Sequence, residues 1–447
     1  MDLCLTLPSH PNKTCLDPLS ITDKDNPSCW NVITTLIEQF QTSRSSVHGL
    51  PALIEDISVS LFGKSVDTEF LSLFFKTNYP SDSEELVKGI IDNALLLPQL
   101  FPSHTLPFLN FTHTVELTHS QVKCLLAHQF LNTLTPPKGN NWGCTFTLWY
   151  SKFQPLESAV AGYLSTLFTY LLLPIEDSEP ITYSYVNIPR SEPLDEVDSW
   201  KSQHGYPFHQ ALAVEPITTA GLQYPHPEIT CALIASNKEP GFGPACTQEE
   251  LVTGSCPPLL LLGALLVSPP VPSDAALICT GTLPVSFWSG IGREARKLDI
   301  DLSIGRRTFL FLDASELDAA IEGHHGIPDL HPDIFFRDLH KAYVGLSAVS
   351  NLGITRITSP LWGAGSFGGD PVIKTIVLSL AAARAGLQIY VSVDDSRTYC
   401  STSNPFVSNT TNSNPSLLSI LQNLKADGEN WSFTRILDVR SMVCTQE

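Results

Sequence analysis

The chain has 447 residues, of which 43% are hydrophobic and only 16% charged, and this composition excludes a disordered protein and predicts one large or two smaller globular domains. With 26 basic against 45 acidic residues, the formal charge of −19 excludes sequence-independent binding to DNA or RNA, because a polyanion would be repelled. The eleven cysteines are an odd number, and they lie outside any Cys-x-x-Cys pair, which favours a reducing compartment.

No stretch of the sequence predicts contact with a membrane. Residues 1–13 lack the basic start and long apolar centre of a secretion signal. The most apolar run, residues 259–267, lies between proline pairs and is too short to span a bilayer. We therefore expect this run to form a buried helix or strand.

The first part of the chain has helical periodicity. An amphipathic stretch at residues 31–40 predicts a helix, and apolar residues recur at helical spacing from residue 50 to 132. Thr118 or Ser120 is placed to cap a helix over residues 122–131. Because Pro, Gly and Asn gather at residues 136–141, we predict a helical accessory region over 1–135 and a second domain over 141–447.

Short apolar strands alternate with helices after this boundary, which predicts an α/β sheet. The apolar run at 372–383 predicts a helix, as does the stretch at 417–424, and residues 401–415 have the composition of a flexible loop. The predicted strands are residues 145–150, 181–186, 231–235, 276–279, 308–312 and 388–393.

The stretch Gly241-Phe-Gly-Pro-Ala-Cys-Thr-Gln-Glu-Glu250 joins a glycine-containing loop to an amide and two carboxylates. One interpretation is a helix start, because acidic side chains are stabilised by the unpaired N–H groups of a first turn. The other interpretation is a catalytic site, in which one carboxyl is a general acid and its neighbour accepts hydrogen bonds from substrate hydroxyls. Cys246 has no basic neighbour in sequence to activate it, so we interpret it as a packing residue.

A second glycine-rich stretch is Trp362-Gly-Ala-Gly-Ser-Phe-Gly-Gly-Asp370, which precedes the predicted helix at 372–383. Successive backbone N–H groups in such a loop, followed by a helix N-terminus, can bind a phosphate or diphosphate without any lysine. The alternative is a tight turn whose Phe367 fills the core.

Together these two stretches resemble the signature of the poly(ADP-ribose) glycohydrolase family. Segments 121–130, 276–282 and 337–345 also resemble the family, in the same order, so that the resemblance covers roughly residues 50–395. It implies a macrodomain-like mixed sheet flanked by helices, with an N-terminal helical accessory region. It also implies hydrolysis of ribose–ribose O-glycosidic bonds with no metal or organic cofactor.

The resemblance assigns the catalytic residues to the Gln-Glu-Glu motif. Glu250 would protonate the leaving ribose oxygen and then activate the attacking water. Glu249 and Gln248 would hold ribose hydroxyls or other polar groups nearby, and Glu249 is counted with the catalytic residues.

The substrate-binding residues are assigned in the same way. Phe367 would pack on a ribose, while Gly363, Gly365 and Ser366 would present N–H groups to the diphosphate. Trp288 would stack on adenine, although an ordinary core tryptophan is the alternative. Asn237 stands where the family also has Asn.

Three positions depart from the family pattern. Lys238-Glu-Pro240 replaces a glycine triplet, Ile234 stands where Asp is usual, and Val393 stands where a second aromatic adenine wall is usual. These departures leave open an alternative function, a catalytically impaired protein that binds ADP-ribose without cleaving it. A weaker alternative is a structural or interaction protein in which the glycine loops merely turn the chain.

The expected partners are poly(ADP-ribose) or ADP-ribose and ADP-ribosylated proteins, with no direct DNA binding, no membrane and a monomeric chain. Residues 323–326 with His331 carry several imidazoles, but their spacing lacks a further metal ligand, and a surface loop is the favoured interpretation. The cysteine pattern predicts an intracellular protein, and because no basic localisation cluster is present, we expect it in the nucleus, the cytoplasm or both.

Overall fold

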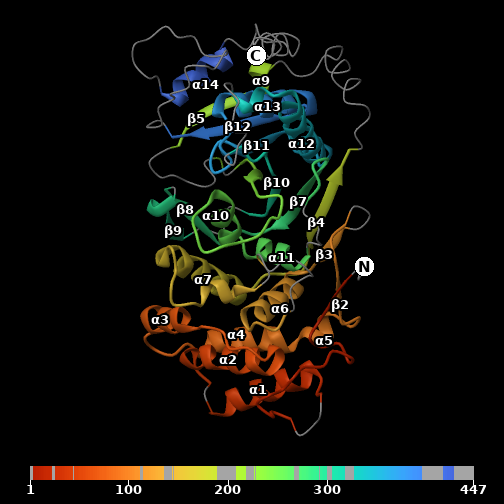
Figure 1. Cartoon of the computed structure of the whole chain (residues 1–447), viewed down its shortest axis with the longest axis vertical. Coiled ribbons are helices and arrows are strands. Elements are labelled where there is room, and N and C mark those ends of the chain that lie inside the picture. The colour runs from red at the N-terminus through yellow and green to blue at the C-terminus, as the bar shows by residue number, and fades with distance from the viewer. Residues whose placement is uncertain are drawn as a thin grey trace. The chain divides into compact units, whose positions relative to one another are not determined.

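The chain forms two compact units, which are shown in a computed structural model (Figure 1). Unit 1 comprises Met1–Tyr183, Glu239–Pro270 and Thr280–Arg306, and unit 2 comprises Ser184–Lys238, Val271–Cys279 and Arg307–Glu447. The structure describes residues 4–22, 26–43, 45–110, 114–134, 143, 145–188, 208–217, 226, 228–265, 271–290, 292–299, 305–317, 327–394 and 416–426. The predicted boundary at 136–141 and the predicted loop at 401–415 lie outside the described residues.

Unit 1 begins with helices whose apolar faces are buried. The helices predicted at 31–40 and 122–131 are confirmed as α1 (Cys29–Ser43) and α6 (His119–Phe130), and Thr118 caps α6. Strand β1 (Cys4–Thr6) pairs antiparallel with β2 (Thr105–Pro107) and ties the start of the chain to this unit. The other early elements are η1 (Val47–Gly49), α2 (Leu50–Phe62), α3 (Glu69–Asn78), α4 (Glu84–Leu95), α5 (Leu97–Leu100) and β3 (Val115–Leu117).

The strand predicted at residues 145–150 is wrong, because this segment forms the 3-10 turn η2 (Phe146–Trp149). Its rings at positions 146 and 149 are both buried and stack with their centroids 4.8 Å apart. A 3-10 turn places residues three apart on one face, whereas a strand would point them to opposite faces.

The remaining elements of unit 1 surround the Gln-Glu-Glu motif. Helix α10 packs on α7, and β8 pairs antiparallel with β9. The apolar run predicted to be buried forms η3 and α11, whose residues are all buried. The bounds are α7 (Glu157–Leu172), α10 (Gln248–Ser255), η3 (Pro257–Leu261), α11 (Leu262–Leu265), β8 (Ser286–Ser289), η4 (Gly292–Glu294) and β9 (Arg296–Asp299).

An eight-stranded mixed sheet has the order β3-β4-β7-β10-β6-β11-β12-β5. Strands β10, β6, β11, β12 and β5 belong to unit 2 and pair in parallel, with Leu310 opposite Leu233 and Ile389 opposite Leu212. Within unit 1, β3 pairs antiparallel with the first residues of β4. The bounds are β4 (Ile181–Asn187), β5 (Leu212–Pro216), β6 (Cys231–Ala235), β7 (Ala275–Thr282), β10 (Arg307–Leu312), β11 (Arg356–Ser359) and β12 (Gln388–Val393).

The other five predicted strands are therefore confirmed as β4, β6, β7, β10 and β12. The sheet and its flanking helices confirm the predicted mixed α/β fold. Helices α12 and α13 lie side by side in unit 2 (Figure 1). The helices of unit 2 are α9 (Phe208–Ala211), η6 (Pro328–Leu330), α12 (Pro332–Asn351), α13 (Pro371–Ala385) and α14 (Leu417–Ala426).

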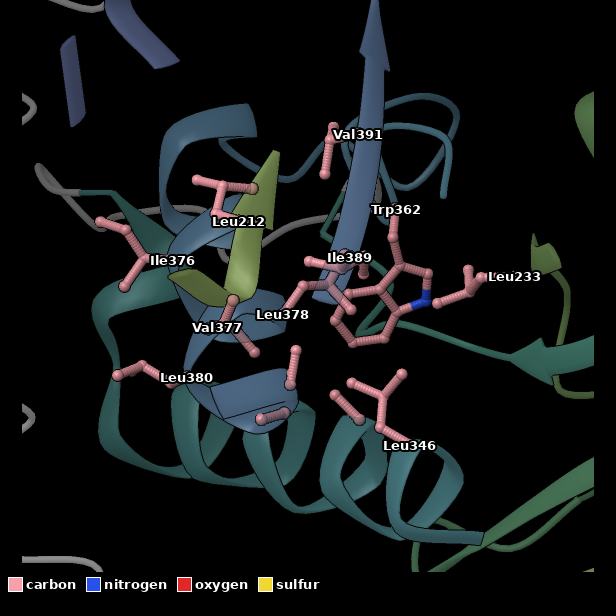
Figure 2. Close-up of a cluster of buried hydrophobic side chains, with 14 of the residues drawn as sticks. Leu212, Leu233, Leu346, Trp362, Ile376, Val377, Leu378, Leu380, Ile389 and Val391 are labelled. Carbon is pink, nitrogen blue, oxygen red and sulfur yellow. The ribbon is translucent and has the colours of Figure 1, made fainter. Parts of the chain in front are cut away.

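The core of unit 2 lies between these helices and the parallel strands. Figure 2 shows Trp362 between Leu233, Ile389 and Leu346, which come from β6, β12 and α12. The indole Nε1–H of Trp362 donates to the carbonyl of Leu312 at 3.0 Å. The first residue of the glycine-rich loop is thus fixed in the core, which gives the exposed loop a rigid base.

Among the helices that the structure describes, none combines the length and the apolar composition needed to cross a bilayer.

Candidate functional site

The Gln-Glu-Glu motif opens helix α10 in unit 1, as the helix-start interpretation predicts. Thr247 is the N-cap, and its hydroxyl accepts a hydrogen bond from the N–H of Glu250 at 3.2 Å. The Glu250 carboxylate reaches back to the Thr247 N–H, so that the two residues form a reciprocal capping box.

Both carboxylates of the motif are buried and are held by donors of the preceding loop. Glu249 is 7% exposed and accepts the Gly241 N–H at 3.0 Å. Glu250 is 5% exposed, and its Oε2 accepts both the N–H and the hydroxyl of Thr247, at 3.0 and 2.9 Å. Among the residues that the structure describes, its Oε1 accepts a single, longer bond from the Ala245 N–H, at 3.4 Å. Backbone N–H groups of the loop therefore donate to both carboxylates, and Oε1 has the weaker hydrogen bonding of the two Glu250 oxygens.

Cys246 lies beside these acids but is not activated. Burial is the main reason that the pKa of its thiol is raised, and the nearby Glu250 carboxylate raises it further. The thiol is therefore protonated at neutral pH and is a poor nucleophile. This agrees with its interpretation as a packing residue.

Trp288 lies on β8 in unit 1 and is only 2% exposed. Its ring packs against Tyr163, with ring centroids 5.0 Å apart, and against the backbone of Gly162, where an added Cβ would lie 2.6 Å from the indole. These contacts are typical of an ordinary core tryptophan, which is the alternative to adenine stacking. Stacking of Trp288 on adenine stays a prediction, and it would require the ring to become accessible.

The glycine-rich loop lies in unit 2 and turns at two glycines with positive φ. Gly363 and Gly368 both have φ of 71°, a conformation that L side chains rarely adopt. The Gly368 and Gly369 N–H groups close the loop on itself, each at 3.0 Å. Within the described residues, the N–H groups of Gly365, Ser366 and Phe367 have no acceptor. Three successive donors at an exposed turn are suited to a phosphate or diphosphate.

The other predicted residues of unit 2 follow the carboxyl ends of parallel strands. Asn237 follows β6, and the glycine-rich loop follows β11. This edge of a parallel sheet is the usual place for ligands in α/β proteins. Phe367 is half-buried and packs on the core of unit 2, while Ser366 is exposed. Ile234 and Val393 are fully buried, as their apolar side chains require.

A cluster of buried charged side chains contacts the glycine-rich loop. Lys374 on α13 lies 2.9 Å from Asp329 and also pairs with Asp338, and all three side chains are almost fully buried. Asp329 accepts the Asp370 N–H at 2.7 Å, and Asp370 caps α13. The stem of Lys374 fills the space beside Gly363, so that the loop rests on the cluster.

Residues of α12 complete this cluster. Arg337 pairs with Asp338 at 2.8 Å and with Asp313, and Lys341 lies 2.5 Å from Asp313. The three acids and three bases balance in charge, which is what burial of ions requires. The predicted segment 337–345 contained a signal for this cluster, because it places three charged residues within five positions of a helix whose residues are largely buried.

Sequence reasoning also missed two aromatic residues that hold the acid loop, Trp149 and Tyr163. They donate to the carbonyls of Gly243 and Ala245 in unit 1. Both donors come from segments distant in sequence from the loop, so no local pattern pointed to them.

The part of the chain that the structure describes contains no group of three or more His, Cys, Asp or Glu side chains placed to hold a metal ion. Of the candidate imidazoles, His324 and His325 lie outside the described residues, and the exposed His331 lies 4.0 Å from Asp333.

Known structures resemble the chain only distantly. A poly(ADP-ribose) glycohydrolase from Deinococcus radiodurans, in a crystal structure with ADP-ribose, is 14% identical and has a TM-score of 0.35, with 54% of this chain and 94% of that chain covered. One from Thermomonospora curvata is 13% identical with a TM-score of 0.25, and 71% of this chain and 95% of that chain are covered. Likeness at this level carries no argument about the site.

Family profiles give the stronger result. The profile described as poly(ADP-ribose) glycohydrolase, helical domain, matches residues 83–188, and the profile described as poly(ADP-ribose) glycohydrolase, macro domain fold, matches residues 230–399. The match to the helical domain comes before the match to the macro domain in the chain. Together the two matches span more than half of the 447 residues. The chain therefore belongs to the poly(ADP-ribose) glycohydrolase family, whose members are glycoside hydrolases acting on poly(ADP-ribose).

Proposed function

We propose that this chain hydrolyses the ribose–ribose bonds of poly(ADP-ribose) and releases ADP-ribose, with Glu250 as general acid and then general base. The observation that supports this most directly is the pair of buried carboxylates, Glu249 and Glu250, on the first turn of α10. A buried acid beside a short, backbone-lined loop is suited to proton transfer in a site from which water is partly excluded.

The two oxygens of Glu250 have different roles in this proposal. Oε2 is fixed by two short hydrogen bonds from Thr247, whereas Oε1 accepts a longer bond of 3.4 Å from Ala245. Oε1 therefore carries the proton that passes to the leaving ribose oxygen. After the bond breaks, the same oxygen accepts a proton from the water that attacks the oxocarbenium-like carbon.

The other predicted residues have roles within their own units in this proposal. Glu249 and Gln248 accept hydrogen bonds from ribose hydroxyls, Asn237 adds a further polar contact, and the turn at Gly365, Ser366 and Phe367 donates to the diphosphate. Because these last donors are backbone N–H groups, the net charge of −19 does not prevent binding of one terminal unit.

One observation favours a second candidate, an ADP-ribose-binding protein without turnover. Oε2 of Glu250 takes part in capping α10 and Oε1 accepts a hydrogen bond from the loop, which are structural roles that need no catalysis. The Lys238-Glu-Pro240 sequence, which replaces the family's glycine triplet, would be the cause of the lost activity in this case.

A comparison of the natural chain with Glu250→Gln separates the two candidates. Gln serves at this position of a capping box, as Gln121 does with Thr118 at the start of α6, so the variant is expected to fold. We expect the natural chain to release ADP-ribose from purified polymer and the variant to be at least about a thousandfold slower, while calorimetry shows similar ADP-ribose affinity. Binding by both proteins without release by either would favour the second candidate.

We also propose that the protein acts inside the cell, in the nucleus, the cytoplasm or both, on the basis of its eleven cysteines. Cell fractionation with a tagged chain tests this, and accumulation in the medium would contradict it.

A further inference from the structure

The acid loop of unit 1 is held by two side-chain donors from outside it. The Trp149 indole N–H donates to the Gly243 carbonyl at 2.9 Å, and the Tyr163 hydroxyl donates to the Ala245 carbonyl at 2.6 Å. The peptide unit between these two carbonyls carries the Ala245 N–H, which donates to Glu250. The two donors therefore fix the loop on either side of an amide that contacts the proposed acid.

The donors are themselves rigid. Trp149 and Tyr163 are fully buried, and their rings stack with centroids 5.4 Å apart. Phe146 also stacks on Trp149, with ring centroids 4.8 Å apart, and Phe242 of the loop packs against Trp149 at 4.9 Å. Buried aromatic rings in such contact have few alternative rotamers, so they hold a hydrogen-bond partner in one place.

The same cluster also sets the position of α10. The Tyr163 ring overlaps the space that a side chain at Gly254 would need, since an added Cβ there would lie 2.5 Å from Cε1 of the ring. One tyrosine thus contacts the helix that carries both acids and the loop that donates to them. A loop that lacks the family's glycine triplet gains its fixed geometry from these contacts.

We infer that Trp149 and Tyr163 are positioning residues for the hydrolysis, acting through the loop carbonyls on Glu249 and Glu250. This inference rests on the proposed function. Loss of a residue that positions the catalytic acid should lower kcat more than it weakens substrate binding, because the position of the acid matters most when the proton is transferred.

The test compares Tyr163→Phe and Trp149→Phe with Tyr170→Phe. Tyr170 is a matched control because it is a buried tyrosine of the same helix whose hydroxyl bonds His119 at 2.7 Å and not the loop. We expect kcat for ADP-ribose release to fall about tenfold to a hundredfold in the first two variants, with KM and the stoichiometry of ADP-ribose binding unchanged, and to stay within about twofold in the control. In a Glu250→Gln background, Tyr163→Phe should cause no further loss.

Hydrogen exchange supplies a readout that does not depend on activity. The amides of Ala245 and Thr247 should exchange about tenfold faster or more in Tyr163→Phe but not in Tyr170→Phe. Equal kcat in Tyr163→Phe and Tyr170→Phe, or unchanged exchange at the two loop amides, would overturn the inference while leaving the proposed function intact. Absence of release by the natural chain would instead overturn the proposed function and the catalytic part of the inference with it.

Discussion

Replacement of Lys374 by Met tests whether the buried ionic cluster supports the glycine-rich loop. Lys374 lies 2.9 Å from Asp329 and also pairs with Asp338, and the three side chains are at most 2% exposed. Burial already raises the pKa of Asp329, and the Lys374 ammonium opposes that rise. Without the ammonium, Asp329 would lose the cation that lies 2.9 Å away, whereas Asp338 would keep its pair with Arg337.

Removal of one partner from a buried ion pair costs about 3–5 kcal/mol, because the other charge is left uncompensated. Since 1.4 kcal/mol is a factor of about ten, amides of α13 should exchange with solvent roughly 10²- to 4 × 10³-fold faster in Lys374→Met. Hydrogen exchange with mass spectrometry is the assay, since it reports the opening of one helix and does not require the whole chain to unfold in one step.

Two variants serve as controls for this experiment. Lys238→Met removes an exposed lysine of the same unit, 3.4 Å from Glu316, and should change exchange little because surface pairs contribute about 0–1 kcal/mol. The double change of Lys374→Met with Asp329→Asn should recover part of the loss, since the amide still accepts the Asp370 N–H. If Lys374→Met is no more damaging than Lys238→Met, the cluster does not support the loop.

Three further predictions use other parts of the chain. Burial lowers the pKa of His119 and of His128 to about 4, whereas an unfolded histidine titrates near 6.5, so the unfolded state binds more protons between these values. Unfolding in urea should therefore show stability falling as the pH drops from about 6.5 to 4, by about 3 kcal/mol for each histidine, and a flat profile would contradict this. Gly363→Ala should destabilise unit 2 by roughly 1–3 kcal/mol in thermal melts, because its φ is 71° and its Cβ would meet a neighbour at 2.7 Å, whereas Gly365→Ala, with open space, should be neutral. Gly254→Ala should lower both thermal stability and turnover, since the methyl displaces the ring beside it; an unchanged melting temperature would argue against that contact.

Elements with a local signal were predictable from sequence. Thr118 with Gln121, and Thr247 with Glu250, have the spacing of capping boxes, and both begin helices. The glycine-rich loop and the helix after it were predicted because glycines and an apolar run are contiguous. Strand β11 was not, because its four residues include an exposed arginine and lack a run long enough to stand out.

Contacts between residues far apart in the sequence could not be predicted from the sequence. Trp288 was assigned to adenine from its place after β7, but its packing against Gly162 and Tyr163 depends on a helix more than a hundred residues earlier. The partners of Lys374 likewise come from η6 and α12, so its burial followed from tertiary structure alone. Spacing predicts a helix start or a turn, whereas pairing in three dimensions depends on the whole fold.

The two capping boxes bear on the choice between catalysis and mere binding. At the start of α6 the reciprocal bond to the cap is made by the neutral amide of Gln121. At the start of α10 the same bond is made by Glu250, which is 5% exposed and directly follows another buried carboxylate. A buried ionisable group costs more to desolvate than an amide, and a neighbouring carboxylate adds repulsion. Since an amide is sufficient for the cap, the cap does not require an ionisable group at position 250, which agrees with the role in proton transfer that we propose for Glu250.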